Sequence, residues 1–304
     1  MEYVLKTNHL TKTISGKDIV SDIELHVKKG EIYGFLGPNG AGKTSIMKMI
    51  TNLWKPTSGT IELFGETVTA KSYEILKRMG SIIEFPTFYE HMTGKENLQI
   101  HCEYMNFFDF SSIDNTLDLL DLTDAADKLV KSYSLGMKER LGIARAILCK
   151  PELLILDEPT NGLDPAGMKQ VRDLLKRLSV EQGITVIISS HILSEIESIA
   201  DTVGIIHHGK MMKEVSMKDI EEMNQNYIEA AVSDTKKATH ILIEQLNLSD
   251  FKVVDKDKVR IYDHNASTRE ISKAFALNDV EIIAIGKNTE TLEDYFLKLT
   301  GGEE

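Results

Sequence analysis

The sequence lacks any apolar stretch long enough to cross a lipid bilayer. A spanning helix needs about 20 apolar residues in a row, whereas the longest apolar runs, LLIL at 153–156 and TVIIS at 185–189, have the length of strands. The first residues, MEYVLKTNHL, also lack a basic region followed by an apolar stretch, so we expect no secretory signal. If this protein acts at a membrane, we expect another chain to cross it.

Cysteine and positive charge are also scarce. The two cysteines, Cys102 and Cys149, stand far apart without the spacing of metal ligands, so we expect buried, inert thiols in a reducing cytoplasm. The 35 Lys and Arg are outnumbered by 47 Asp and Glu, which gives a formal net charge of -12. Nucleic-acid affinity rests mainly on clustered Lys and Arg. Because the sequence has no such cluster, we expect no nucleic-acid partner.

Residues 1–214 alternate short apolar strands with amphipathic helices. This order predicts an α/β domain in which helices cover a largely parallel sheet. The buried strands are expected at 31–37, 153–158 and 185–191. A helical insert at about 90–148 divides the domain, and Thr93 with Glu96 forms a capping-box pattern at the start of its first helix.

The remaining third of the chain has a different order of elements. A polar helix and linker are expected at 215–226. Over 227–304 the order strand, helix, strand, strand, helix, strand predicts a small α+β accessory domain of the βαββαβ type, closed by a helix at 291–300. This domain contains no catalytic motif, so we expect it to regulate or to stabilise a dimer.

A glycine-rich loop follows the strand at 31–37 directly. The stretch GPNGAGKTS fits GxxxxGKT and runs into a helix, which is the order that defines a P-loop NTPase domain. Its glycines let backbone N–H groups face the phosphates of ATP, its lysine reaches the β- and γ-phosphates, and its threonine hydroxyl binds Mg²⁺. An ordinary glycine turn explains neither this order nor the motifs that follow. The residues expected to bind ATP here are Gly37, Pro38, Asn39, Gly40, Ala41, Gly42, Lys43, Thr44 and Ser45.

Two acidic residues end the strand at 153–158. The apolar run LLIL leads directly to Asp157 and Glu158. We expect Asp157 to hold Mg²⁺ together with Thr44, and Glu158 to polarise the water that attacks the γ-phosphate, with Lys43 as a further catalytic group. Acidic residues at strand ends are often only helix caps, but that explanation leaves the pair unexplained in a chain with a phosphate loop.

A histidine ends the strand at 185–191. His191 follows the run TVIISS, at an edge where the ends of neighbouring parallel strands are expected to meet. A lone histidine often has only a structural role. We favour a catalytic role for His191, because from this edge an imidazole reaches the γ-phosphate and the attacking water.

A second helix start has the features of an anion site. In the stretch SLGMK, Ser134 is placed to cap a helix and Gly136 leaves the backbone open. The free N–H groups and the positive dipole end of such a start favour an anion. Since the phosphate loop is the better phosphate site, this helix start needs a different explanation.

Residues 4–214 resemble the ATP-binding subunit of ABC transporters. The motifs GPNGAGKT, SLGMK, LLILDE and NGLD and the final histidine stand in the order of that family. The resemblance implies a head-to-tail homodimer with two ATP molecules between the copies, in which Ser134 and Gly136 address the γ-phosphate of the ATP that the partner holds. Asp164 would lie along the same interface. It also implies separate transmembrane permease subunits, and hence a cytoplasmic chain, peripheral on the inner face of the cell membrane.

Three features differ from the usual family pattern, the first being Leu135 and Met137 in the signature, where the family more often has Ser or Gly and Gly or Gln. The family commonly has Gln after the strand that here reads GSIIEFP, and Glu84 in its place is predicted as a ligand of Mg²⁺. Where the family often stacks adenine on an aromatic ring, Ile14 offers apolar contact. Glu84 and the following FPTFYEHMTGKENL resemble the subfamily that exports bacitracin or lantibiotics and confers self-protection. The aromatic stretch from Phe85 to Tyr89 is expected to touch the permease.

The predicted function is that of an ATP-hydrolysing subunit, which dimerises on ATP and drives export of a drug or antimicrobial peptide through separate membrane subunits. A soluble ABC-type ATPase without a membrane partner is the alternative. The translation type of such ATPases would carry two motif sets and the DNA type a long coiled coil, and the sequence has neither. A nucleotide-binding module without hydrolysis leaves the intact catalytic set unexplained.

Overall fold

The chain divides into two compact units, with the boundary between Met217 and Lys218. The computed structural model describes residues 2–109, 111–223, 226–263 and 266–289, together with Leu292, Tyr295, Phe296 and Leu299. The boundary falls inside the segment expected to be a linker, where the helix α8 spans Met217–Met223. The helix expected at 291–300 lies for the most part outside the described residues.

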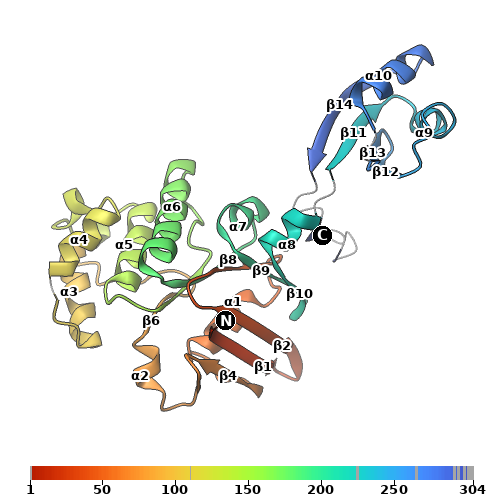
Figure 1. Ribbon diagram of the computed structural model, residues 1–304. Coiled ribbons are helices and arrows are strands. Elements are labelled where there is room, and N and C mark those ends of the chain that lie inside the picture. Colours follow the sequence, from red (N-terminus) through yellow and green to blue (C-terminus); the bar gives the residue numbers. More distant parts are fainter. Residues whose placement is uncertain are drawn as a thin grey trace. The chain divides into compact units, whose positions relative to one another are not determined.

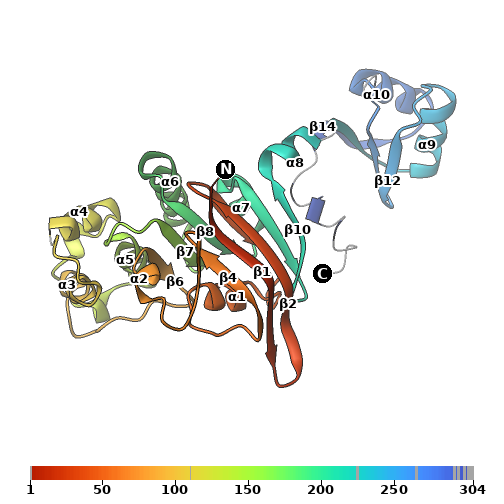
Figure 2. The same ribbon diagram turned by 60° about the horizontal axis from the view of Figure 1, so that its bottom comes forward.

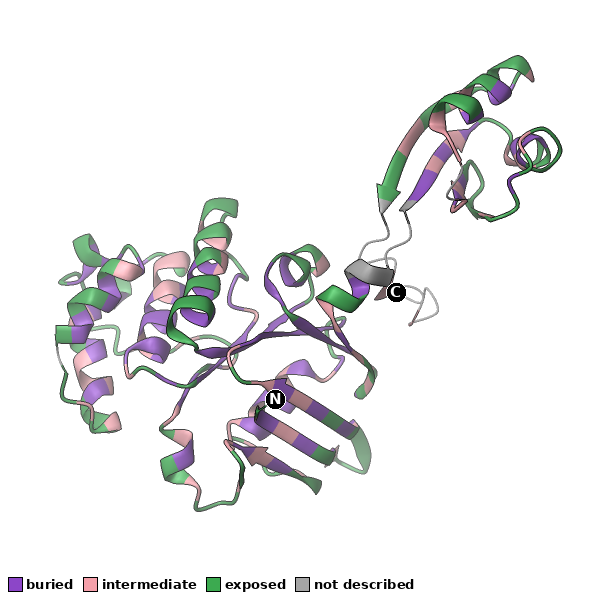
Figure 3. Ribbon diagram, viewed as in Figure 1, coloured by how far each residue is buried: buried purple, intermediate pink, exposed green. Residues whose placement is uncertain are grey.

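A six-stranded sheet forms the centre of the first unit, in the order β10-β9-β3-β8-β7-β6. The strands from β9 to β6 run parallel, and β10 is antiparallel to β9. Every residue of β3, β7 and β8 is buried (Figure 3), as their largely apolar sequences require. The three strands predicted from those runs are therefore confirmed. The bounds are β3 Ile32–Leu36, β6 Met79–Ile82, β7 Leu153–Asp157, β8 Thr185–Ser190, β9 Thr202–His207 and β10 Lys210–Ser216.

A second, antiparallel sheet of the first unit has the order β2-β1-β4-β5. Its first hairpin turns at Ser15 and Gly16, whose φ angles of 52° and 79° are the left-handed values that tight two-residue turns favour. The helix α1 (Lys43–Ile50) lies between this sheet and the central one (Figure 1), and its apolar side chains share one core with both. The bounds are β1 Tyr3–Ile14, β2 Lys17–Lys28, β4 Ser58–Leu63, β5 Glu66–Thr67 and the short helix α2 Tyr73–Leu76.

The helices α6 (Pro165–Gln182) and α7 (Leu193–Ile199) cover the opposite face of the central sheet from α1 (Figure 1). The local sequence sets both ends of α6. Asp164 accepts the backbone N–H of Gly167 at 2.9 Å as a helix cap, a proline follows in the first turn, and Gly183 ends the helix with a φ of 67°.

The predicted helical insert is confirmed as a group of helices beside β6, with α3 and α4 next to α5 (Figure 2). The capping box at the start of α3 is also confirmed. The Thr93 side chain accepts the backbone N–H of Glu96, and the Glu96 carboxylate accepts that of Thr93. The bounds are α3 Gly94–Met105, α4 Ser111–Leu119, α5 Leu135–Ile147 and two short 3-10 helices, Thr123–Ala125 and Val130–Ser132.

The second unit has a four-stranded antiparallel sheet in the order β12-β13-β11-β14. The order of its elements along the chain confirms the βαββαβ prediction. Apolar residues of its strands and of α9 and α10, among them Ala230, Val259 and Phe275, form a core of their own. The bounds are β11 Asn226–Val232, α9 Thr235–Glu244, β12 Phe251–Asp255, β13 Lys258–Ile261, α10 Thr268–Leu277 and β14 Ile282–Thr289.

Candidate functional site

The phosphate loop joins β3 to α1 and bends as only glycine readily allows. Gly40 and Gly42 have φ angles of 80° and 110°, in the left-handed region that favours glycine. A Cβ atom at Gly37 would lie 2.2 Å from the carbonyl oxygen of Ile206, so β9 leaves no room for a side chain there. The loop residues from Pro38 to Ser45 line a cleft of about 300 Å³, together with Ile19 and Glu158.

The Lys43 ammonium is held inside this loop. Only 5% of the residue is exposed, and its Nζ donates to the carbonyl oxygens of Gly37 at 2.6 Å and Pro38 at 3.4 Å. The Lys43 Nζ also lies 3.4 Å from Oε1 of Glu158. Because the lysine stem has several rotatable bonds and the ammonium three donors, the same group can exchange these oxygens for those of a phosphate.

Thr44 and Asp157, from α1 and the end of β7, lie in direct contact. The Thr44 hydroxyl donates to Oδ2 of Asp157 at 2.7 Å. The other carboxylate oxygen of Asp157 accepts from the Ser189 hydroxyl at 2.6 Å, and Asp157 is buried. A hydroxyl and a carboxylate held side by side are hard oxygen donors of the kind that Mg²⁺ prefers. The two residues therefore fit the ion predicted for them.

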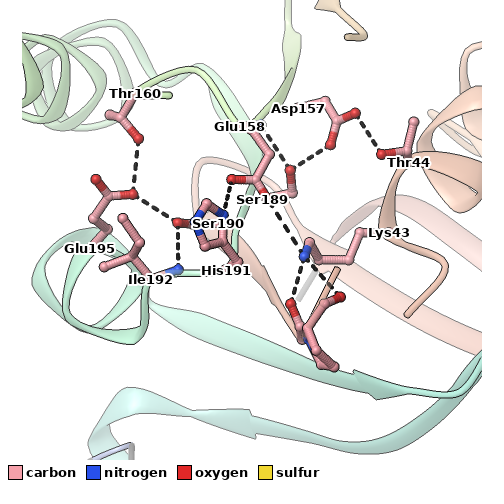
Figure 4. A network of polar contacts seen from close by, with 12 residues as sticks. Lys43, Thr44, Asp157, Glu158, Thr160, Ser189, Ser190, His191, Ile192 and Glu195 are labelled. Atoms are coloured by element: carbon pink, nitrogen blue, oxygen red, sulfur yellow. Dashed lines mark hydrogen bonds and ion pairs between the residues drawn. The ribbon is translucent and has the colours of Figure 1, made fainter. Parts of the chain in front are cut away.

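Glu158 stands between Lys43 and His191 (Figure 4). Its Oε2 lies 2.7 Å from Nδ1 of His191, and its backbone N–H donates to the Ser189 hydroxyl at 2.9 Å. The φ of Glu158 is 51°, an uncommon value for a residue with a side chain. Since β3, β8 and β7 are neighbours in the sheet, their ends bring together the three motifs that the sequence separates.

Ser134, Gly136 and Asp164 do not line the phosphate cleft of their own chain. Ser134 is exposed and caps α5 by accepting the backbone N–H of Met137 at 3.3 Å. Asp164 is exposed at the cap of α6. A Cβ atom at Gly136 would lie 3.2 Å from the Leu163 side chain, so the two helix starts are close to each other. The phosphate loop and the helix start at Ser134, for which anion binding was predicted, therefore lie on separate surfaces of the described chain.

Neither Glu84 nor Ile14 is among the residues that line the phosphate cleft. The Glu84 side chain is 61% exposed, and its Oε1 accepts from the Lys48 ammonium at 2.6 Å. Ile14 ends β1, is 42% exposed, and does not line the phosphate cleft, which Ile19 of β2 lines instead. The roles of Glu84 as a metal ligand and of Ile14 beside adenine remain predictions.

Ser189 and Ile19 belong to the site but were not predicted from the sequence. The only signal for Ser189 was that two serines end an otherwise apolar buried strand, TVIISS. Ile19 has no such signal, because the register of the β1–β2 hairpin decides which side chain reaches the loop. The inert thiols are consistent with the structure: Cys102 is buried, and burial raises the pKa of Cys149 to about 11.

Comparison with known proteins gives consistent results. The family described as "ABC transporter" matches residues 20–161. The uncharacterized ABC transporter ATP-binding protein YcbN of Bacillus subtilis is 54% identical over 99% of this chain and 98% of its own. The bacitracin transport ATP-binding protein BcrA of Enterococcus faecalis is 48% identical over 99% of this chain and 98% of its own.

The fold is also found among solved structures. The dimeric structure of a post-hydrolysis state of the ATP-binding cassette MJ0796, bound to ADP and phosphate, covers 70% of this chain and 98% of its own with a TM-score of 0.64 and 23% identity. Within the described residues, no helix combines the length and the apolar character that crossing a bilayer demands. The full-length relatives and the assembled motif set show that this chain belongs to the ABC transporter ATP-binding proteins and is an ATPase of that family.

Proposed function

We propose that this ATPase is the energy-coupling subunit of a multi-chain exporter for a drug or antimicrobial peptide. The observation that carries the proposal is the contact chain from Thr44 and Asp157 through Ser189 to Glu158 and His191. It supports hydrolysis as the working activity. The 48% identity to a bacitracin transport protein, over nearly the whole of both chains, supports the substrate class.

Each residue of the site has a separate task in hydrolysis. Lys43 exchanges the carbonyl oxygens of the loop for oxygens of the β- and γ-phosphates and stabilises their charge. Glu158 accepts a proton from the attacking water as its oxygen approaches the γ-phosphate. His191, 2.7 Å from that carboxylate, orients it and donates toward the γ-phosphate.

Thr44 and Asp157 are the residues that would hold Mg²⁺. When bound, the ion would supply positive charge that neutralises the charge on the phosphates. Ser189 fixes the Asp157 carboxylate through the hydroxyl contact at 2.6 Å, as outer-shell partners commonly do for metal ligands. For Glu84 to join this set, its carboxylate would have to leave Lys48, which it contacts at 2.6 Å.

A second copy of the chain completes the site in this proposal. Ser134 and Gly136 present an anion-binding helix start, yet neither lines the phosphate cleft of the same chain. A head-to-tail homodimer brings the helix start of one copy to the γ-phosphate held by the other, with Asp164 along the interface. Hydrolysis then removes the shared phosphate and releases the contact.

The proposed contact with the permease is a groove of about 380 Å³. Part of its lining, residues 87–89, comes shortly after Glu84 in the sequence. Phe88, Tyr89, His101, Tyr104 and Arg145 are among its lining residues. The Arg145 guanidinium lies 4.9 Å from the centre of the Phe88 ring and donates to the Thr87 carbonyl at 2.8 Å. Burial lowers the pKa of His101 to about 4, so this side chain is neutral and suits an apolar partner. This contact would hold the chain in the cytoplasm, on the inner face of the cell membrane.

Co-purification tests the transporter assignment. The full chain is expressed with the membrane-spanning proteins encoded beside it, and membranes are solubilised in detergent. We expect the chain to co-purify with a membrane-spanning partner, and Tyr104→Ala to weaken that association. Tyr73→Ala is the matched control, because both tyrosines are exposed, at 75% and 67%. Recovery only from the cytosol, despite the presence of those proteins, would favour a soluble ATPase.

A further inference from the structure

Glu195 is a buried carboxylate next to the catalytic residues. It lies in α7, one turn after His191, and only 3% of it is exposed. Its chemistry is not used in the hydrolysis described above. A carboxylate taken out of water must be held by other groups or it destabilises the fold, so its partners indicate what it does.

Those partners come from two segments, the loop after β7 and the end of β8 (Figure 4). Oε2 of Glu195 accepts from the Thr160 hydroxyl at 2.9 Å and from the Ser190 hydroxyl at 2.7 Å. The Ser190 hydroxyl oxygen also accepts the backbone N–H of Ile192 at 3.0 Å. A single oxygen atom therefore ties the loop after β7 to the last residue of β8.

A catalytic side chain lies close to each of these two partners in the sequence. Thr160 lies two residues after Glu158, and Ser190 directly precedes His191. The same two segments of the chain are also in contact through His191 Nδ1 and Glu158 Oε2, which lie 2.7 Å apart. The two segments are thus joined at two places, by the contact between Glu158 and His191 and by the contacts of Glu195.

The arrangement is kept at a cost in stability. The second oxygen of Glu195, Oε1, is buried and has no hydrogen-bond partner among the residues that the structure describes. A buried acceptor without a partner destabilises the folded state. Apolar packing between these two segments needs no carboxylate, whereas accepting two hydroxyls on one atom needs an oxygen with two free lone pairs. Holding the two hydroxyls therefore explains the presence of a carboxylate at Glu195 better than packing does.

We propose that Glu195 is a positioning residue, which sets the distance and orientation between Glu158 and His191 by holding Thr160 and Ser190 on one oxygen atom. The proposal rests on the roles assigned to Glu158 and His191 in hydrolysis. Glu195 is buried and does not line the phosphate cleft. Its removal should slow the chemical step while the phosphate loop, on the other side of Glu158, still binds ATP.

The test compares ATP affinity with turnover in the full-length chain. Glu195→Ala is expected to lower kcat by about 100-fold, the loss that a displacement of 1 Å in a catalytic group typically causes. The dissociation constant for ATP, measured by equilibrium binding, should stay the same. Glu195→Gln should recover much of the rate, because its amide oxygen also accepts from the two hydroxyls. Glu197→Ala, an exposed glutamate of the same helix, is the matched control and should turn over normally.

Thr160→Val extends the test without removing the carboxylate. It deletes one hydroxyl and keeps the shape of the side chain. The losses in kcat from Thr160→Val and Glu195→Ala should be far from additive in the double variant, because both break the same connection. If Glu195→Ala does not fold, Thr160→Val and Glu195→Gln still report on that connection.

Different results would overturn this proposal and the hydrolysis on which it rests. Full kcat in Glu195→Ala, or a parallel loss of ATP binding and kcat that Glu195→Gln does not relieve, would overturn the positioning role. Additive losses in the double variant would do the same. Normal turnover by Glu158→Gln would instead overturn the assignment of the catalytic base, whatever Glu195 does.

Discussion

The two units of this chain both pack helices against a sheet, but their sheets present polar side chains in different ways. In the first unit the central strands run parallel, so β3, β8 and β7 end at the same edge. That edge carries the phosphate loop, Asp157 and His191. In the second unit the strands are antiparallel, and neighbouring strands end at opposite edges. Its polar pair Glu229 and Arg260 lies across two neighbouring strands instead, with 2.9 Å between Oε2 and Nε.

This difference explains why one unit holds a reaction site. A parallel sheet gathers residues that are far apart in sequence at one edge, where loops can vary without disturbing the strands. An antiparallel pair fixes side chains against each other on a face of the sheet, which stabilises the pairing of the strands. The comparison predicts that equal substitutions have unequal consequences in the two units.

The largest expected effect comes from exchanging a carboxylate for an amide in each unit. Glu158→Gln removes the proposed base and should lower kcat by about 1000-fold, within the range typical of general-base catalysis. ATP binding should persist. Glu229→Gln in the second unit should leave kcat unchanged. Phosphate-release assays on both variants measure the two kcat values. Comparable rates would contradict the claim that only the first unit holds the reaction site.

Lysine substitutions should give the next largest contrast. Lys43→Ala deletes the ammonium expected to contact the β- and γ-phosphates, and a charge-assisted hydrogen bond contributes about 1.5 to 3 kcal/mol. The dissociation constant for ATP should therefore rise roughly 10- to 100-fold. Lys287→Ala on β14, an exposed lysine, should not change it. Calorimetric titration with ATP distinguishes the two outcomes, and unaltered affinity in Lys43→Ala would contradict the proposed role of the loop.

Removal of the second unit should have a smaller effect. Each unit has its own apolar core, so a chain that ends at Met223 should fold and bind ATP with little loss. Circular dichroism and ATP titration measure both properties. A truncated chain that is folded but cannot bind ATP would show that the second unit contributes to the nucleotide site.

The smallest effect concerns the pH dependence of stability at Glu139. This residue of α5 is buried, and burial raises its pKa from 4.5 to about 7. A raised pKa in the folded state means that the neutral form is favoured, so its contribution is complete below pH 4.5 and is lost as the pH rises through 7. Glu139→Gln should thus match the wild type in Tm at pH 5 and exceed it by a few degrees at pH 8.5. An equal difference at both pH values would assign the change to packing.

The sequence predicted those parts of the site that depend on local order. Lys43, Thr44, Asp157, Glu158 and His191 each follow an apolar run that could only be a buried strand, and parallel pairing brings such strand ends together. The order of helices and strands along the second unit was predictable for a similar reason, because turns and periodicity are local.

The parts that were missed depend on contacts across the chain. Ser189, Thr160 and Glu195 are ordinary polar residues in the sequence, and their importance follows only from hydrogen bonds between separate elements of the fold. The Lys48 partner of Glu84, which holds that carboxylate on α1, is 36 residues away. No spacing rule predicts these partners, since the packing of whole elements decides them.

The most direct test of the account is the mass of the full-length Glu158→Gln variant, measured by light scattering after chromatography with and without Mg-ATP. We predict a monomer without nucleotide and a dimer with it, because the helix start at Ser134 needs a phosphate held by a second copy. Ser134→Glu should abolish the dimer by placing a negative charge against that phosphate. A variant that binds ATP yet stays monomeric, both alone and with its membrane partners, would contradict the shared site.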